Sequence, residues 1–373
     1  MSASRKPILT LNSGSSSLKF GVFANSGDDE ELLLSGSAQG IGRDDGTLQI
    51  QAADGTTLVH REAILESQTE ALQTIAASLQ EYLHEAPIAV GHRIVHGGPH
   101  LREHQRITPQ VLQTLDAAVH FAPLHIPSAL QLVRQAQEIF SNATHIACFD
   151  TAFHRTMPPV AAQLPLPSDY FEEGVMRYGF HGLSYESIVH RLGSGLPERT
   201  VMAHLGNGGS VTAVFRGKSI DTSMGLTPTG GIVMGTRTGD LDPGVLLYLI
   251  RKETLGADAL EALVNRSSGL AGYSNGESDM RALLQRRATG DAPATLAVDA
   301  FCLSVRKTIG AYAALMGGID LLVFTGGIGE HSGDVRTRIC DGLEFLGLTP
   351  DRITVVPAQE ELQIARHCRT ILQ

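Results

Sequence analysis

Three turns rich in glycine, serine and asparagine carry the clearest chemical potential in this sequence. They lie within residues 8–23 (ILTLNSGSSSLKFGVF), 201–215 (VMAHLGNGGSVTAVF) and 321–333 (LLVFTGGIGEHSG), each after an apolar run. Small side chains let backbone N–H groups approach a ligand closely, and consecutive N–H groups form a nest that binds anions. Each turn alone could be an ordinary one, but three in this order favour a protein that binds a phosphate-bearing ligand.

Established nucleotide motifs do not account for these turns. A Walker loop requires GxxxxGK[ST], and RGKS at 216–219 supplies its end, but Thr212 stands where the first glycine is required. In GGIGEHS, Ser332 replaces the third glycine of GxGxxG, so a dinucleotide-binding fold has no support. HExxH and GxSxG are also missing from the sequence, which weakens the protease and α/β-hydrolase interpretations.

A series of histidines suggests a metal site at first sight. His92, His96, His100 and His104 recur every four residues, the spacing that places ligands on one face of a helix. The intervening run 97–99, Gly-Gly-Pro, would interrupt such a helix at considerable cost. A zinc site on this segment is therefore disfavoured.

The elements that must position the turns are predicted from hydrophobic periodicity. The first and second turns each join two strands, 8–11 with 18–23 in the first case, so the chain contains an internal duplication with two facing hairpins. Thr108 and Pro109 predict a helix start, and the apolar residues up to Val119 share one face. Further strands are expected near 31–38, 47–51, 56–60 and 87–95, and a helix over 68–84.

Composition limits the class of protein. A chain of 373 residues exceeds the size of one efficient core, so two domains are expected, divided near residue 151 before a proline-rich loop. A net charge of −10 argues against a protein that coats nucleic acid or an anionic membrane. Four cysteines without a CxxC pair, and the lack of a signal peptide or long apolar run, predict a reduced, cytoplasmic protein.

A series of longer motifs then connects the sequence to a known family. The strings are LNSGSSSLKF, GHRIVHGG, APLHIP, FDTAFHRTMP, YGFHGLS, HLGNGGS, MGTRTGDLDPG, FTGGIGE and PAQEELQIAR. In order and spacing the chain resembles the acetate kinase (acetokinase) family, from the first strand to about residue 368. The resemblance implies an α/β, duplicated two-domain actin-like ATPase (ribonuclease H-like) fold with an interdomain cleft, with domains at 1–151 and 152–373 and a C-terminal tail that packs on the N-terminal domain.

The resemblance also implies an activity, namely reversible ATP-dependent phosphorylation of acetate to acetyl phosphate by direct in-line transfer. Implied with it are Mg²⁺, for which Mn²⁺ substitutes, a homodimer, and a role in acetyl-CoA biosynthesis. By resemblance, Asn12 and Glu360 hold the metal, Asp150, His181, Arg237 and His125 are catalytic, Arg93 binds the substrate carboxylate, and Val95, Leu124, Phe180 and Pro228 form the apolar pocket. The implied ATP contacts are Ser15, Ser17, Lys19, His204, Leu205, Gly206, Asn207, Gly208, Asp279, Met280, Arg281, Gly326, Gly327, Ile328, Gly329 and Glu330.

These residue types suit phosphoryl transfer, in which the protein mainly positions reactants and neutralises charge on the transferred group. Simpler alternatives stay open: His125 and His181 could be core histidines, and Arg93 and Arg237 could pair with structural carboxylates. Asp150 is not needed as a base, because a small carboxylic acid is already an anion at pH 7. It could order a metal-bound water or orient an Arg or His, and a covalent acyl-phosphate is the less favoured alternative.

Two departures from the family pattern border the expected substrate region. Ile126 stands where the family usually has Asn in APLHNP, and Gly230 where it usually has Glu in TPxEG. Propionate, or a mixture of short-chain acids, is therefore the closest rival to acetate, since one methylene changes discrimination by only ~1–3 kcal/mol. A non-catalytic actin-like ATP-binding protein is a remote alternative, and a sugar kinase is disfavoured because Arg93 suits a carboxylate rather than a hydroxyl group.

Overall fold

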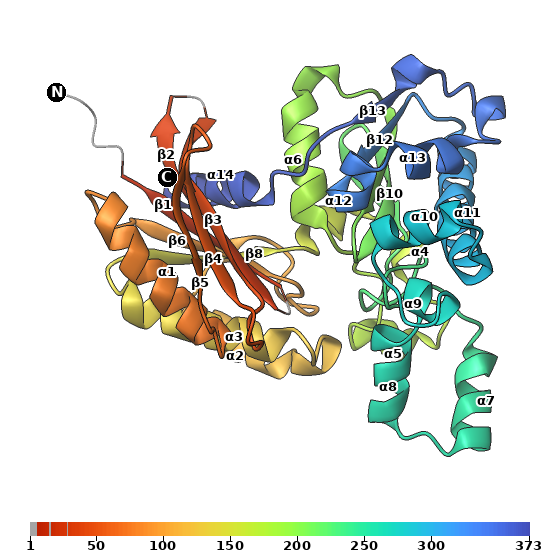
Figure 1. The fold of residues 1–373 in the computed structure, drawn as a ribbon, viewed down its shortest axis with the longest axis horizontal. Helices are drawn as coiled ribbons and strands as arrows, with labels where there is room; N and C mark the ends of the chain where they lie inside the picture. Colours follow the sequence, from red (N-terminus) through yellow and green to blue (C-terminus); the bar gives the residue numbers. More distant parts are fainter. Residues whose placement is uncertain (1–5, 15, 28) are drawn as a thin grey trace. The chain divides into compact units, whose positions relative to one another are not determined.

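The computed structural model describes residues 6–14, 16–27 and 29–373. Its contacts divide the chain into two compact units (Figure 1). The first unit contains the N-terminal part up to Ala152 together with Gly182–Ser187 and Gln359–Gln373. The second contains Phe153–His181 and Ile188–Ala358. The first unit is therefore built from three separate segments of the chain.

The first unit is organised on an eight-stranded mixed sheet with the order β5-β4-β3-β2-β1-β6-β8-β7. Strand β1 pairs antiparallel with β2 and parallel with β6, and β6 in turn pairs parallel with β8. The strands are β1 (Ile8–Ser13), β2 (Ser17–Ser26), β3 (Asp29–Gln39), β4 (Thr47–Ala52), β5 (Thr57–Glu62), β6 (Ala89–Ile94), β7 (Gln105–Arg106) and β8 (Thr144–Phe149).

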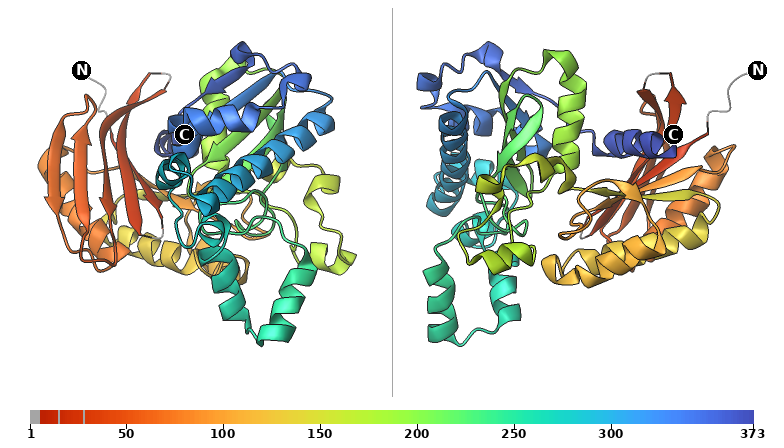
Figure 2. Two further views of the ribbon diagram at one scale, coloured as in Figure 1. Left: turned by 45° about the vertical axis from the view of Figure 1, so that its right-hand side comes forward. Right: turned by 180° about the vertical axis from the view of Figure 1, so that it is seen from behind.

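Helices cover both faces of this sheet because its central strands are apolar on both sides. In β1, Leu9 and Leu11 belong to a core shared with α1 (Gln68–Tyr82) and α3 (Ile126–Ile139). Ile8 points to the opposite face, where it packs with Ile364 and Cys368 of α14 (Glu360–Leu372). Figures 1 and 2 show α14 against the sheet, far in sequence from the strands that it covers.

The second unit contains a five-stranded sheet with the order β11-β10-β9-β12-β13. Its strands are β9 (Arg199–Leu205), β10 (Gly209–Phe215), β11 (Lys218–Thr222), β12 (Leu321–Thr325) and β13 (Ile353–Val355). Three strands form an antiparallel meander and β9, β12 and β13 run parallel. The same arrangement occurs in β3-β2-β1-β6-β8, so the two sheets repeat one topology, as the duplicated actin-like fold requires.

The remaining helices connect these strands or lie against them. The 25-residue α11 contacts β9 and β10, and its N-terminus is capped by Asp291, whose side chain accepts a hydrogen bond from Ala294 N–H. The helices are α2 (Pro109–Ala117), α4 (Pro159–Ala162), α5 (Ser168–Glu172), α6 (Gly182–Leu192), α7 (Pro243–Glu253), α8 (Ala257–Arg266), α9 (Gly269–Tyr273), α10 (Met280–Ala288), α11 (Ala292–Met316), α12 (Gly326–His331) and α13 (Gly333–Cys340). Short 3₁₀ turns span Val119–Phe121, Ala152–Thr156, Gly193–Gly195, Glu344–Leu346 and Pro350–Arg352.

Most local predictions agree with these elements. Thr108 caps α2, because its side chain accepts a hydrogen bond from Val111 N–H. The prediction that this helix continues to Val119 is wrong, since α2 ends at Ala117 and a 3₁₀ turn follows. The glycines after β12 form the short helix α12, which α13 follows. Among the described residues, no helix is long and apolar enough to span a membrane.

Candidate active site

Polar and charged side chains gather where the parallel strands of the first sheet end. Asn12 lies near the end of β1, Arg93 near the end of β6, and Asp150 directly after β8. Because these strands are parallel neighbours, their carboxyl ends meet at one edge of the sheet. This is the edge at which open α/β sheets bind ligands.

Arg93 and Asp150 form a forked ion pair. Arg93 Nε donates to Asp150 Oδ1 over 3.1 Å, and Nη2 donates to Oδ2 over 2.5 Å. Burial raises the pKa of Asp150 to about 6, against the opposing effect of Arg93. Burial alone would lower the pKa of Arg93, but the carboxylates of Asp150 and Glu360 raise it well above its usual value. Arg93 is therefore paired with Asp150, another residue that the resemblance implies for the site.

Oxygen-bearing side chains converge next to this pair. Asn12 Nδ2 donates to Glu360 Oε2 and to Glu361 Oε1, both at 2.9 Å. Asn12 Oδ1 accepts from Arg93 Nη1 at 3.2 Å. An amide oxygen and two carboxylates are hard oxygen donors of the kind that Mg²⁺ prefers. The side chains present thus fit a magnesium site, and Glu361 adds a carboxylate that the motif comparison did not include.

The other predicted residues of the first unit lie at varied places. Lys19 is exposed on β2 and lies opposite Asn12 in the β1–β2 register, and Ser17 begins β2. Ser15 lies outside the described residues. His125 is half-buried and precedes α3, while Val95 is half-buried and Leu124 is 42% exposed.

Two predicted catalytic residues of the second unit lie close to each other. His181 has a left-handed backbone with φ of 59°, and its Nδ1 is 2.9 Å from the Ser210 hydroxyl oxygen. Its ring stacks on His204, with centroids 4.2 Å apart and planes 12° apart. A Cβ atom on Gly208 would lie 3.3 Å from Arg237 Nη1 and 3.7 Å from His181 Nε2. Gly208 thus brings the backbone of the second turn close to both side chains.

The Arg237 guanidinium is hydrogen-bonded to the backbone. Its Nη1 donates to the carbonyl oxygen of Pro228 over 3.0 Å. Phe180, directly before His181, is 1% exposed, and its carbonyl oxygen lies 2.9 Å from His154 Nε2.

A cavity of about 830 Å³ opens within the second unit. Its lining brings together residues from all three predicted ATP-contact segments of this unit, in the second turn, at the start of α10 and in α12: Gly206, Asn207, Asp279, Met280, Arg281, Gly327 and Ile328. The volume falls in the range of roughly 300–1,000 Å³ that is common for small-molecule sites. Ser278, Leu284, His331 and Ser332 also line the cavity and were missed in the sequence. In the sequence, the only indication for Ser278, His331 and Ser332 was that they adjoin motif residues. For Leu284 it was a spacing of one helical turn from Met280.

Not every predicted ATP contact lines this cavity. Glu330 Oε1 instead accepts hydrogen bonds from Gly326 N–H at 3.0 Å and Ala358 N–H at 3.1 Å. This carboxylate therefore fixes the start of α12. His204, Leu205, Gly208, Gly326 and Gly329 also lie outside the cavity lining.

The two departures from the family pattern have clear structural settings. Ile126 is 1% exposed and begins α3. A Cβ on Gly230 would lie 3.1 Å from Asp240 Oδ1, the same oxygen that accepts from Gly231 N–H at 2.7 Å. Asp240 therefore fills the space in which a longer side chain at position 230 would begin.

The repeated topology, the glycine turns and the charged strand ends define a phosphotransferase of the actin-like class. Comparison with known proteins specifies the class further: the chain belongs to the acetokinase family, whose sequence model matches residues 7–366. An acetate kinase of Leifsonia xyli subsp. xyli is 41% identical over 392 residues, covering 96% of this chain and 97% of the relative.

Solved structures agree with this assignment. Porphyromonas gingivalis acetate kinase superposes with a TM-score of 0.87 at 35% identity, covering 99% of this chain and 100% of that one. A propionate kinase from Francisella tularensis subsp. tularensis superposes with a TM-score of 0.89 at 34% identity, covering 97% of this chain and 98% of that one. The fold is thus shared with kinases named for two different acids.

Proposed function

We propose that this chain catalyses reversible transfer of the γ-phosphoryl group of ATP to acetate, giving acetyl phosphate and ADP. A carboxylate oxygen of acetate forms the new bond to phosphorus as the bond to the ADP oxygen breaks, so no proton has to be removed. The observation that carries this proposal is the setting of Arg93. Its guanidinium is fixed by the buried Asp150 and donates to Asn12, whose amide contacts the carboxylates of Glu360 and Glu361. The relatives named acetate kinase support the choice of acid.

The residue roles follow from chemistry and family resemblance. Arg93 binds the acid carboxylate, and Asp150 holds Arg93 in orientation through its forked hydrogen bonds. His181 and Arg237 donate to the oxygens of the transferred phosphoryl group, where charge must be neutralised, with His125 as a further catalytic residue. The cavity of the second unit binds the adenosine part of ATP, and the apolar residues Val95, Leu124, Phe180 and Pro228 contact the alkyl end of the acid.

Magnesium is part of this proposal. Asn12 and Glu360 would hold it, and Glu361 offers a further carboxylate oxygen. The bound ion would offset negative charge on the phosphate oxygens, and Mn²⁺ should substitute for it. The chain's own contribution is to keep these oxygens together through the Asn12 amide.

Propionate is the second candidate substrate. It is favoured by the close structural match to a propionate kinase and by the departures at Ile126 and Gly230. ADP release should be measured with acetate, propionate, butyrate and no acid, each with and without Mg²⁺. We expect the highest kcat/KM with acetate and little release without acid or metal. Release that is independent of any acid would refute the proposal, and a higher kcat/KM for propionate would reassign the substrate.

We further propose a homodimer that works in the cytoplasm and supplies acetyl phosphate for acetyl-CoA biosynthesis. Helix α7 supports association, because none of its residues is buried and its Leu247 and Tyr248 are 51% and 54% exposed. The four free cysteines support a reducing compartment. Light scattering of the purified chain should give twice its 39.8 kDa mass, and a monomer would contradict this.

A further inference from the structure

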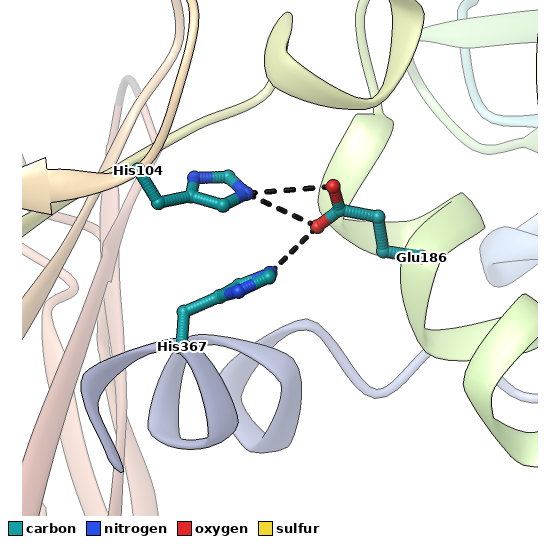
Figure 3. A group of neighbouring side chains, drawn as sticks. All are labelled: His104, Glu186 and His367. Atoms are coloured by element: carbon teal, nitrogen blue, oxygen red, sulfur yellow. Dashed lines mark hydrogen bonds and ion pairs between the residues drawn. The ribbon is translucent and has the colours of Figure 1, made fainter. Parts of the chain in front are cut away.

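Three ionisable side chains of the first unit form a cluster apart from the residues assigned above. His104 lies in the loop before β7, Glu186 on α6 and His367 on α14 (Figure 3). His104 Nε2 lies 3.2 Å from Glu186 Oε2, and His367 Nε2 lies 2.7 Å from the same oxygen. The two imidazole rings have centroids 3.9 Å apart. Segments distant in the sequence thus meet at one carboxylate.

The cluster is largely removed from solvent. The exposed fraction of the side chain is 10% for His104, 13% for Glu186 and 22% for His367. Burial by itself raises the pKa of Glu186, but hydrogen bonds from the two histidines outweigh burial and bring it to about 2. Glu186 is therefore a buried anion, and buried anions are retained in proteins only when they are paired.

The backbone determines which nitrogen of His104 carries its proton. Phe149 N–H donates to His104 Nδ1 over 3.1 Å, so Nδ1 is an acceptor and the neutral ring carries its proton on Nε2. That proton points to Glu186. A contact of 2.7 Å between His367 Nε2 and Glu186 Oε2 also requires a proton between them. Glu186 hence accepts two hydrogen bonds.

Two histidines and a glutamate also resemble a transition-metal ligand set, but the tautomer argues against this use. A metal at His104 Nε2 would move the ring proton to Nδ1, where it would face the N–H of Phe149. Metal-bound histidines normally donate from the second nitrogen rather than accept there. The geometry thus favours a hydrogen-bonded junction of His104, Glu186 and His367 over a metal site.

One side of this junction leads to Asp150. Phe149, whose N–H is bound by His104, directly precedes Asp150 in the chain. The carbonyl oxygen of Asp150 accepts from Gly182 N–H at 2.8 Å, and Gly182 lies one helical turn before Glu186 on α6. The backbone on both sides of Asp150 is thereby tied to elements that meet at Glu186.

The other side leads to the proposed metal ligands. His367 and Glu360 are seven residues apart on α14, which places them on the same face of the helix. Glu360 and Glu361 contact Asn12 from the first turn of that helix. A displacement of α14 at His367 would therefore move both carboxylates relative to Asn12.

We propose that Glu186 is a positioning residue: through His104 and His367 it holds Asp150 and helix α14 so that Asn12, Glu360 and Glu361 bind the divalent cation. This inference rests on the proposed function of those residues. Loss of a partner that orients metal ligands typically lowers metal affinity or activity by roughly 10–100-fold. The ATP cavity of the second unit contains none of the cluster residues.

The test compares the wild-type chain with E186Q, H367A and the control H190Q, which changes an exposed histidine of the same helix. Mn²⁺ binding is measured by electron paramagnetic resonance without ATP, and kcat, KM for ATP and Tm are measured in parallel. For E186Q we expect Mn²⁺ binding and kcat to fall by about tenfold or more, with KM for ATP within about twofold. H367A should weaken Mn²⁺ binding in the same direction, and H190Q should match the wild type.

Several outcomes would overturn this assignment. One is folded E186Q that retains the Mn²⁺ affinity and kcat of the wild type. If E186Q does not fold, the deciding variant is H367A. An H367A protein that binds Mn²⁺ as tightly as the wild type would then overturn the proposal. One tightly bound Zn²⁺ per wild-type chain, lost in E186Q, would show a metal site in place of the junction. A wild-type chain that neither binds Mn²⁺ nor needs a divalent cation would instead refute the proposed metal ligands themselves.

Discussion

The two sheets share one topology but differ in what their turns present to a ligand. In the first unit, the strand ends carry Arg93, Asp150 and Asn12, and Arg93 donates hydrogen bonds to both of the others. In the second unit, the matching turn after β9 carries Gly206, Asn207 and Gly208, and an open cavity lies beside it. The same sheet topology thus carries a hydrogen-bonded group of polar and charged side chains in the first unit. In the second unit it carries a glycine turn without charged side chains, next to a cavity.

A duplicated fold can in this way offer the two substrates of one reaction two different kinds of binding site. Charged side chains that are paired before the substrate arrives lose little orientational freedom on binding. Glycine turns give no charge but admit a bulky nucleotide. Substitutions in the first unit should therefore affect turnover or stability, and substitutions at the cavity should affect ATP binding.

The largest effect is expected from Asp150→Asn. The amide cannot accept from both nitrogens of Arg93 as the carboxylate does, so kcat should fall by about 10³-fold, equivalent to about 4 kcal/mol of barrier. Steady-state kinetics and circular dichroism measure this together. The control is Asp116→Asn, which removes an exposed pair with Arg134 and should change kcat less than about twofold. Near-normal turnover in Asp150→Asn would refute its role.

Acid stability should reveal the buried anion at Glu186. Its pKa in the folded chain, about 2, lies below the ordinary value of 4.5. Its carboxylate therefore stabilises the fold above pH 4.5, and this stabilisation, on the order of 3 kcal/mol, is lost as pH falls toward 2. Urea unfolding at pH 7, 4.5 and 3 should show this loss in the wild type and not in E186Q. Parallel pH profiles for the two proteins would contradict the assigned hydrogen bonds.

Arg237→Ala tests the second unit's cationic group. If Arg237 neutralises transition-state charge as proposed, its removal should lower kcat by about 10²-fold, or about 2.7 kcal/mol, with little change in the KM for ATP. The exposed Arg251 of α7 supplies a matched control. An effect on KM for ATP alone would place Arg237 in nucleotide binding instead.

The smallest effect is expected at the cavity. A Cβ on Gly327 meets no atom within 4 Å, so Gly327→Leu should fold and extend into the ATP cavity. KM for ATP should rise by about tenfold, equivalent to about 1.4 kcal/mol, with kcat nearly unchanged. Gly256→Leu, also with open space around its Cβ, is the control. A rise in KM for acetate instead would contradict the assignment of the cavity to ATP.

The sequence allowed much of the fold to be predicted because its signals were local. Alternating apolar residues and glycine turns identified the β1–β2 and β9–β10 hairpins, and a Thr-Pro pair identified the start of α2. The end of α2 was missed because apolar residues continue past Ala117 into a three-residue 3₁₀ turn, which is too short to show a period of its own. Periodicity alone does not distinguish these two helical forms.

Site residues were predictable where a motif carries them and not where only tertiary structure joins them. Seven of the sixteen ATP contacts expected from the motifs line one cavity. Nothing in the sequence around His104 or His367 indicated that both meet Glu186, because the three lie on separate elements. The regular histidine spacing gave no indication of it either: His92 contacts His145, whereas His104 contacts Glu186.

The discontinuous first unit has a consequence for biosynthesis. Ile364 and Cys368 of α14 fill a core that also contains Ile8 of the first strand. On the ribosome the nascent chain emerges from its N-terminus, so the core around Ile8 closes only after α14 has been synthesised. The residues of the second unit, 153–181 and 188–358, are thus synthesised before this core of the first unit can close.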